Sequence, residues 1–362
     1  GDDCVYTHLS PKSGDIDCII AIHVDDILVA CAPTKAKRVK SMLEEAYTLG
    51  PSTGDDSLSW YLKVQIDFDD NGNRVDFSQT AYINDMLTKW RMQDANPRDT
   101  PAPPNTRMAK AKQPMTSEDR EWLESRGLTN TRYRSVVGEL SYLADRTRPD
   151  IAFAVNQLQR HLEDSRREQW VYAKWLLAYL KGTATLKLRF TKPKPEESVV
   201  GASDSDWAGD PDDRSSTSGY IFTYGGGAIS WKSKKQKLPA KGNTPEEELI
   251  ARSSAEAELI ALDFATREAL WIRKIESGLN IGNGGPTKIQ EDNEAAIAIS
   301  AKHRRTPRTK HIDTQFFAVS NDIQFKRIDV VPVASKDNLA DAFTKSLDRV
   351  KFERFRSMMG LV

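Results

Sequence analysis

The chain has 362 residues, which is enough for two or three domains at roughly 150 residues each. Its 52 basic and 52 acidic side chains cancel, so bulk charge does not mark the protein as a nucleic-acid binder. No signal peptide and no apolar run of about 18 residues is present, which argues against a secreted or membrane-spanning protein.

The first predicted element is a hairpin at residues 18–31, CIIAIHVDDILVAC. Two apolar runs flank Asp25 and Asp26, and two carboxylates are too costly to bury together without partners. The pair is therefore expected at the turn, where Asp is common, and an ordinary hairpin is the alternative interpretation. Cys4, Cys18 and Cys31 form no CxxC pair and are predicted to be reduced, buried thiols of an intracellular protein.

A second hairpin and a set of helices follow. An alternating strand is predicted across residues 57–66, the letters DDNG at 69–72 signal a turn, and the strand resumes at 77–79. Apolar spacing predicts an amphipathic helix at 80–90. The proline-rich stretch 97–114 indicates an extended linker. Three more helices are predicted at 133–144, 147–156 and 169–181, with aromatic side chains in their core, before a short linker at 192–197.

Strands and helices alternate in the C-terminal part. Strands are predicted at 198–204, 219–223, 228–232, 287–291 and 328–333, and helices at 254–278, 293–301, 311–321 and 338–345.

Acidic residues recur at the ends of these elements. Asp204 and Asp206 are two apart on one strand and would crowd the same face, although a solvated strand end is the alternative interpretation. Further acids stand in SSAEAEL at 253–259, QEDN at 290–293 and DNLADAF at 337–343. A strand-end Asp, a helix Glu, a second strand-end Asp and a last helix Asp make a four-carboxylate set able to hold two divalent ions.

Two of these positions have close rivals. Glu256 and Glu258 project about 200° apart on a helix, so only one can face the site. Asp337 competes with Asp341, but its place predicts a helix N-cap.

The C-terminal sequence resembles the ribonuclease H domain of copia-type retrotransposon polyproteins. The matching motifs are SDSDWAGD at 203–210, RSSTSGY at 214–220, ISWKSKKQ at 229–236, SSAEAE at 253–258, DN at 292–293, RTKHID at 308–313 and LADAFTK at 339–345. The resemblance implies a metal-dependent enzyme that hydrolyses RNA in RNA–DNA hybrids, with Mg²⁺ (or Mn²⁺) held by Asp204, Glu258, Asp292 and Asp341. It also implies a five-stranded mixed sheet, in which the first three strands are antiparallel and the later ones are added in parallel.

The upstream sequence resembles the copia reverse transcriptase. The hairpin at Asp25 and Asp26 matches the YxDD hairpin of the palm, where both carboxylates would bind metal, although the family usually has Tyr where His23 stands. Residues 57–79 resemble the primer-grip hairpin, and 133–183 the thumb and connection. The chain opens on Gly1 and not on Met, so we expect a fragment whose first palm strand and fingers are missing and which has no polymerase activity alone.

The fold class expected is therefore a multidomain α+β and α/β protein. The predicted domains are a palm remnant at 1–95, a proline-rich linker at 96–116, a helical thumb and connection at 117–192 and a ribonuclease H-like domain at 198–362.

Nucleic-acid partners follow from the same resemblance. An RNA–DNA hybrid and a primer–template are the expected ligands, together with upstream reverse transcriptase or integrase portions of the polyprotein and without a membrane. The residues predicted to contact nucleic acid are Ser215, Ser216, Thr217, Lys232, Lys234, Lys235, Arg308 and Lys310. The resemblance places the protein in the cytoplasm, within virus-like particles, or in the nucleus.

One departure favours a different function. Residues 237–248 insert three consecutive glutamates where the family has only a few residues. A decayed element that binds nucleic acid without cutting it is therefore the competing interpretation.

Overall fold

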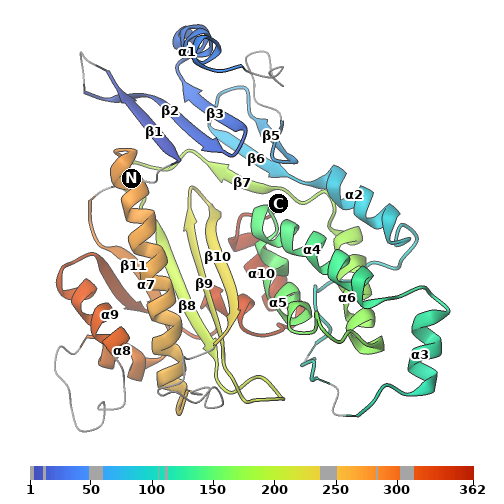
Figure 1. The fold of residues 1–362 in the computed structure, drawn as a ribbon. Helices are drawn as coiled ribbons and strands as arrows, with labels where there is room; N and C mark the ends of the chain where they lie inside the picture. Colours follow the sequence, from blue (N-terminus) through green and yellow to red (C-terminus); the bar gives the residue numbers. More distant parts are fainter. Residues whose placement is uncertain are drawn as a thin grey trace.

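The computed structural model describes residues 4–10, 14–48, 60–104, 106–110, 113–236, 251–282, 284–301 and 314–362. These residues form three β-sheets and the helices that connect and cover them (Figure 1). The 237–248 insert, Arg308 and Lys310 lie outside the described residues, and so does the stretch 49–59.

The N-terminal sheet contains the predicted Asp-Asp hairpin. Its strands β1 (Val5–Leu9), β2 (Ile16–His23) and β3 (Asp26–Cys31) are antiparallel in the order β1-β2-β3, and α1 (Pro33–Ala46) follows. Because His23 pairs with Asp26, the turn consists of Val24 and Asp25, and the hairpin prediction is confirmed. The prediction of three buried thiols is wrong, because Cys4 is exposed and Cys31 only half-buried, although none of the three is in a disulfide.

A four-stranded antiparallel sheet comes next, with the order β4-β5-β6-β7. Its strands are β4 (Trp60–Tyr61), β5 (Val64–Phe68), β6 (Arg74–Ser78) and β7 (Leu188–Thr191). The single strand predicted across 57–66 is wrong within its described part: Leu62 and Lys63 have positive φ angles of 48° and 58° and form a tight turn. At the predicted 69–72 turn, the Asp69 carboxylate accepts hydrogen bonds from the backbone N–H groups of Asn73 and Arg74, at 2.7 and 2.8 Å.

The helical region confirms the predicted helices. It consists of α2 (Thr80–Lys89), α3 (Ser117–Glu124), α4 (Asn130–Arg146), a 3₁₀ turn η1 (Pro149–Ile151), α5 (Ala152–Gln159) and α6 (Arg167–Gly182). The described residues of the proline-rich stretch form no helix or strand, but two of them pack against α6. The Trp175 indole N–H donates to the Thr100 carbonyl at 2.8 Å, and the Arg98 guanidinium lies 4.2 Å from the Trp175 ring centroid.

A buried ion pair just before α5 connects that part of the chain to the end of α6. The Arg148 guanidinium donates to both Asp150 carboxylate oxygens at 2.9 and 2.7 Å, and both side chains are almost fully buried. The Tyr179 hydroxyl also donates to Asp150 at 2.6 Å, and Arg148 reaches the Thr183 carbonyl at 3.1 Å. The start of α5 is thereby fixed to the end of α6.

The third sheet has the predicted five-stranded mixed topology. Its strands are β8 (Val200–Asp206), β9 (Thr217–Tyr224), β10 (Gly227–Lys235), β11 (Thr287–Glu291) and β12 (Ile328–Pro332), in the order β10-β9-β8-β11-β12. Strands β8, β9 and β10 are antiparallel, whereas β11 is parallel to both β8 and β12.

Helices cover this sheet. They are α7 (Ser254–Gly278), α8 (Glu294–Ser300), α9 (Thr314–Gln324), the 3₁₀ turn η3 (Leu339–Phe343) and α10 (Arg349–Met358). Figure 1 shows α7 running along the sheet with α8 and α9 beside it. The predicted helix at 338–345 is thus only a 3₁₀ turn, and Asp337 is not its N-cap. Asn338 has that role, because its side chain accepts a hydrogen bond from the Ala340 N–H.

One hydrophobic core crosses the predicted boundary at 192–198. It joins Tyr179 of the helical region to Ile221 of β9 and to Phe343 and Phe352 near the C-terminus. The Tyr179 and Phe352 rings meet edge to face, with their centroids 5.8 Å apart. A C-terminal segment cut at residue 198 would therefore expose part of this core, and the predicted domain ranges remain a prediction.

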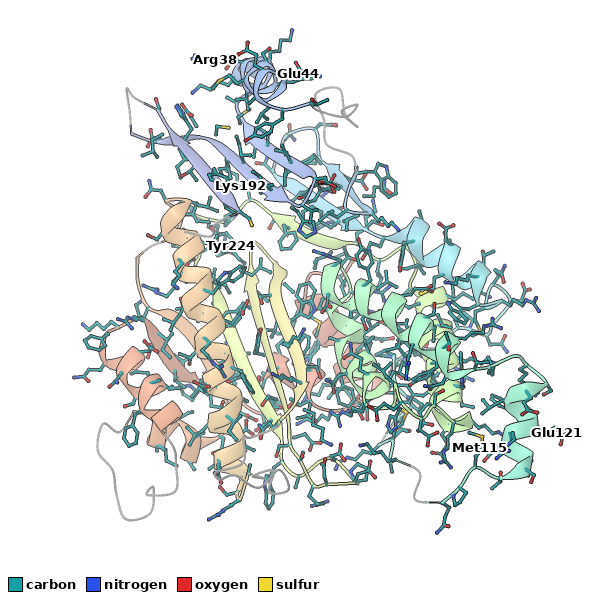
Figure 2. The ribbon with its side chains drawn as sticks, in the orientation of Figure 1. Arg38, Glu44, Met115, Glu121, Lys192 and Tyr224 are labelled. Atoms are coloured by element: carbon teal, nitrogen blue, oxygen red, sulfur yellow. The ribbon has the colours of Figure 1, made fainter. Side chains whose placement is uncertain are left out.

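Strand β7 and the C-terminus join the second sheet to the third. Lys187 exchanges two backbone hydrogen bonds with Val362, at 2.9 and 3.0 Å, and Ala228 donates to the Met359 carbonyl at 2.9 Å. Gly360 allows this close approach, because its φ is 84° and a Cβ atom there would lie 2.7 Å from the Gly227 Cα. In Figure 2, Lys192 after β7 and Tyr224 at the end of β9 mark the junction.

We expect Arg148→Met to lower the free energy of unfolding by about 3–5 kcal/mol, because Asp150 would keep its buried charge without its partner. Urea denaturation followed by tryptophan fluorescence measures this loss. Arg349→Met is the matched control, since its side chain is 61% exposed and loses only surface ion pairs with Asp99 and Glu353, and it should cost less than about 1 kcal/mol. Equal losses in the two variants would contradict the prediction.

Candidate metal centre

Three of the predicted carboxylates meet at one end of the third sheet. Asp204 stands near the end of β8, and Asp292 directly follows β11. Because β8 and β11 are parallel neighbours, their carboxyl ends reach the same edge. Glu258 comes from the first turns of α7, and one carboxylate oxygen from each of the three residues lies within 4.8 Å of the others. Carboxylate oxygens at this spacing can bind one divalent cation.

The cluster is buried and incompletely satisfied. Asp204 is 3% exposed and Glu258 is 7% exposed, while Asp292 is half-buried. The Glu258 Oε2 atom is buried and has no hydrogen-bond partner within the described residues. An orphaned buried carboxylate oxygen is costly, so the donor set fits a hard cation such as Mg²⁺.

Neighbouring side chains orient two of these carboxylates. The Asn338 amide donates to Asp292 Oδ1 at 3.2 Å and to the Ser203 carbonyl at 2.8 Å. The Thr344 hydroxyl donates to Asp204 Oδ2. The segment around η3 therefore holds the ends of both β8 and β11.

Glu291 is a buried carboxylate that the sequence reasoning missed. It is fully buried, and its two oxygens accept hydrogen bonds from the Ser203 hydroxyl at 2.8 Å and the Asn293 N–H at 3.1 Å. Strand alternation was the available signal, because Ile289 and Glu291 share one face and Ile289 is plainly a core residue.

Burial raises the pKa values of three of these carboxyl groups, those of Asp204, Glu258 and Glu291. Desolvation is the main cause in each case: it raises the pKa of Asp204 to about 7 and that of Glu291 to about 8. The pKa of Glu258 is raised further, by burial and then by the negative charges of Glu291, Asp204 and Asp292. Without a cation, the cluster therefore retains protons near neutral pH.

Asp341 lies beside this cluster but outside the group of three. Its carboxylate is buried and binds two ammonium groups, Lys345 at 2.6 Å from Oδ1 and Lys351 on Oδ2. The cation of Lys345 also lies 3.9 Å from Asp204 Oδ2.

The rival acids have other partners. Asp206 pairs with Arg107 at 3.2 Å, and the same guanidinium donates to the Gly209 carbonyl at 2.9 Å. Glu256 accepts a hydrogen bond from the Arg252 N–H at the start of α7. Asp337 pairs with Arg354 at 2.8 Å. The predicted crowding of Asp204 and Asp206 is thus relieved by an arginine of the proline-rich stretch.

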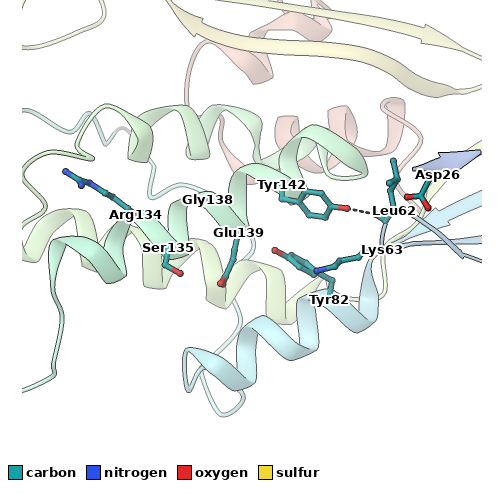
Figure 3. Close-up of a pocket in the computed structure, with 9 residues that line it drawn as sticks. All are labelled: Asp26, Leu62, Lys63, Tyr82, Arg134, Ser135, Gly138, Glu139 and Tyr142. Carbon is teal, nitrogen blue, oxygen red and sulfur yellow. Dashed lines mark hydrogen bonds between the residues drawn. The ribbon is translucent and has the colours of Figure 1, made fainter. Parts of the chain in front are cut away.

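Asp25 and Asp26 belong to a different part of the molecule, the N-terminal sheet (Figure 1). Asp26 lines a cavity of about 700 Å³, which also touches Lys63 and the helix α4. Figure 3 shows Asp26 at one side of this cavity and Glu139 on α4, while the Tyr142 hydroxyl donates to the Leu62 carbonyl.

The predicted nucleic-acid contacts divide into two groups. Ser215, Ser216 and Thr217 are buried and not at the surface, and Thr217 accepts a hydrogen bond from Arg160 at 2.9 Å. Lys235 pairs with Asp210 and Asp213 at 2.7 and 2.5 Å.

Lys232 and Lys234 remain available on β10. The Lys232 side chain is 53% exposed, 3.7 Å from Asp145, and the Lys234 ammonium lies 5.2 Å from the Phe264 ring centroid.

The fold and the cluster define a mixed α/β protein with an acidic site at the carboxyl end of a parallel strand pair. The sequence is 32% identical over 366 residues to the retrovirus-related Pol polyprotein from transposon TNT 1-94 of Nicotiana tabacum, covering 99% of this chain and 25% of that protein. It is 33% identical over 342 residues to the Pol polyprotein from transposon RE1 of Arabidopsis thaliana, covering 94% of this chain and 21% of that protein.

The chain belongs to the family of retrovirus-related Pol polyproteins of copia-type transposons, and it spans about a quarter of the length of these relatives. No protein-family model matches it. The crystal structure of LC11-RNase H1 in complex with an RNA/DNA hybrid aligns with 41% of this chain and 94% of its own, at 14% identity and a TM-score of 0.28. No helix within the described ranges is both long and apolar enough to cross a membrane.

The raised pKa values predict that the metal-free chain loses stability as the pH rises. A carboxyl group whose folded pKa exceeds its unfolded value near 4 stabilises the fold while protonated, and this contribution disappears as the pH passes through the folded pKa. In EDTA, Tm should therefore fall between about pH 5 and pH 8, the window set by Asp204 and Glu291.

Glu258→Gln is the matched variant for this experiment, because it removes one titrating group and keeps its shape. It should flatten the dependence of Tm on pH, and Mn²⁺ should restore the stability of the unmodified chain at pH 8. A metal-free Tm that rises through this window would contradict the assignment of raised pKa values.

Proposed function

We propose that the C-terminal part of this chain hydrolyses the RNA strand of RNA–DNA hybrids in a reaction that requires Mg²⁺ or Mn²⁺. The observation that carries the proposal is the convergence of Asp204, Glu258 and Asp292 at the edge of the sheet. Membership in the Pol polyprotein family and the five-stranded mixed sheet support it.

The residues have distinct roles in this proposal. Asp204, Glu258 and Asp292 hold a divalent ion, and Asp341 is the fourth carboxylate of the set. Bound divalent ions supply an activated water and stabilise the leaving oxygen of a phosphodiester. The hydrogen bond from Asn338 orients the Asp292 carboxylate toward the site, and the hydrogen bond from Thr344 orients the Asp204 carboxylate. Glu291 holds the strand ends together through Ser203.

The hybrid would approach over the exposed lysines of β10. Lys232 and Lys234 project from the strand next to β9 and supply positive charge for phosphate groups. Both strands of a hybrid carry phosphates, so selection of the hybrid also needs contacts to 2′-hydroxyl groups.

The N-terminal sheet supports a second site within the same proposal. Asp25 and Asp26 are the proposed metal-binding carboxylates of a polymerase palm. The cavity beside Asp26 carries Lys63 and Arg134, which suit the backbone of a primer–template. Upstream portions of the polyprotein are the proposed partners of this sheet.

We expect Asp204→Asn and Glu258→Gln to reduce RNA cleavage at least about 100-fold, because each removes a metal ligand. The measurement is cleavage of end-labelled RNA in an RNA–DNA hybrid by the whole chain with Mg²⁺, with duplex DNA as the uncut reference. Asp337→Asn is the matched control, since it removes an acid whose ion pair within the described residues is with Arg354 at the surface.

Folding of each variant is checked by circular dichroism. Asp204→Asn with the activity of the unmodified chain would refute the assignment. A wild-type chain that binds the hybrid and cuts nothing would favour the non-catalytic nucleic-acid binder.

We expect the double variant Lys232→Met, Lys234→Met to bind the hybrid more weakly and with a smaller salt dependence. Each lost phosphate contact should reduce the slope of log K against log salt by roughly 0.9. Fluorescence anisotropy in Ca²⁺ at several salt concentrations measures this slope. Lys187→Met, which changes a half-exposed lysine paired with Asp67 on the second sheet, is the control, and equal slopes in all three proteins would exclude β10 from the interface.

A further inference from the structure

The fourth carboxylate of the proposed site is held by lysines. The Lys345 ammonium lies 2.6 Å from Asp341 Oδ1, and Lys351 of α10 binds Oδ2 and reaches the Ser335 carbonyl at 3.3 Å. Both oxygens of Asp341 therefore already have a cationic partner. Asp341 is also outside the group formed by Asp204, Glu258 and Asp292.

Lys345 also faces Asp204. Its ammonium lies 3.9 Å from Asp204 Oδ2, so a single positive charge sits between two buried carboxylates that come from β8 and η3. Asp204 also has a carboxylate oxygen within 4.8 Å of oxygens of Glu258 and Asp292, and no cation of the described residues forms an ion pair with either of those two acids. Asp204 thus belongs to two cation positions, one shared with Glu258 and Asp292 and one filled by Lys345.

Lys345 is the most exposed of the three residues in this contact. Its side chain is 42% exposed, whereas Asp204 and Asp341 are 3% and 2% exposed. Lys345 follows Asp341 by four residues, and Lys351 forms an ion pair with the other oxygen of Asp341. Movement of Lys345 alone would therefore open a site between two fixed carboxylates.

We propose that Lys345 is a positioning residue whose ammonium occupies one of the two metal positions of this site. The chain then binds one divalent ion tightly among Asp204, Glu258 and Asp292. A second ion binds between Asp204 and Asp341 only by displacing Lys345, and its affinity is lower. This inference rests on the proposed function of the cluster and adds an order of metal loading to it.

The electrostatic effect is large enough to measure. A unit charge about 4 Å from a binding site, at an effective dielectric constant of about 20, changes a binding constant by more than tenfold. Removing the Lys345 charge should therefore tighten the second ion at least about tenfold. The metal-free protein should also become less stable, because Asp341 loses one of its two cations.

The test is a Mn²⁺ titration of the whole chain after EDTA treatment, followed by calorimetry and by the electron paramagnetic resonance signal of free Mn²⁺. The proteins are wild type, Lys345→Met, Lys345→Gln and the charge control Lys187→Met, whose lysine pairs with Asp67 on the second sheet. Wild type and Lys187→Met should bind one ion tightly and a second at least about tenfold more weakly. Both Lys345 variants should bind the second ion at least about tenfold more tightly than wild type.

Thermal melting supplies a second readout. Both Lys345 variants should melt at a lower temperature than wild type in EDTA, and Mn²⁺ should raise their Tm by more than it raises the Tm of wild type. Lys345→Gln serves if Lys345→Met does not fold, because glutamine can still donate a hydrogen bond to Asp341.

The outcomes separate this inference from the proposed function. Two ions of equal affinity in wild type, or isotherms of the folded Lys345 variants that superimpose on wild type, would overturn the role of Lys345. A wild-type chain that cuts the hybrid and shows either result would leave the proposed function standing. A wild-type chain that binds no Mn²⁺ would overturn both.

Discussion

The crowding of carboxylates at the end of β8 is the constraint on which the functional part of this structure depends. Asp204, Glu258, Glu291 and Asp341 are all buried there, and buried carboxylates are stable only with hydrogen bonds, bound protons or cations. Those partners come from different elements: hydroxyls from β8 and the residue after η3, and ammonium groups from the chain leading into α10 and from α10 itself. The cluster is therefore compatible with only a narrow range of positions for each element.

The upstream helices also help to fix the positions of the elements that carry these carboxylates. The 3₁₀ turn η3 carries Asp341 and packs Phe343 into the core shared with α6. Gly219 of β9 lets η3 approach the sheet, because a Cβ atom at that position would lie 2.7 Å from the Phe343 Cβ. A second connection comes from Arg107, which reaches from the proline-rich stretch to Asp206. The helical region is thus a structural support of the acidic site and not merely a neighbour along the chain.

Local patterns in the sequence predicted much of this arrangement. Helix α7 has its predicted bounds because Ser253 caps it and an apolar stripe follows. The Asp-Asp hairpin and the mixed order of the third sheet were also predictable, from flanking apolar strands and from the resemblance to copia polyproteins. The prediction failed where the backbone departs from its local preference, as at Leu62 and Lys63, which take positive φ angles that β-favouring neighbours do not signal.

The sequence by itself determined which acids could form the site, because strand ends and helix starts place carboxylates at predictable points along the chain. Only the tertiary structure decided how those acids are used. Glu291 became part of the buried cluster, Asp206 paired with Arg107, and Asp341 bound Lys345 and Lys351. The physical reason is that the charge state and the partners of a carboxylate depend on burial and on cations a few ångströms away. Residues distant in sequence, such as Arg107 for Asp206, supply many of those partners.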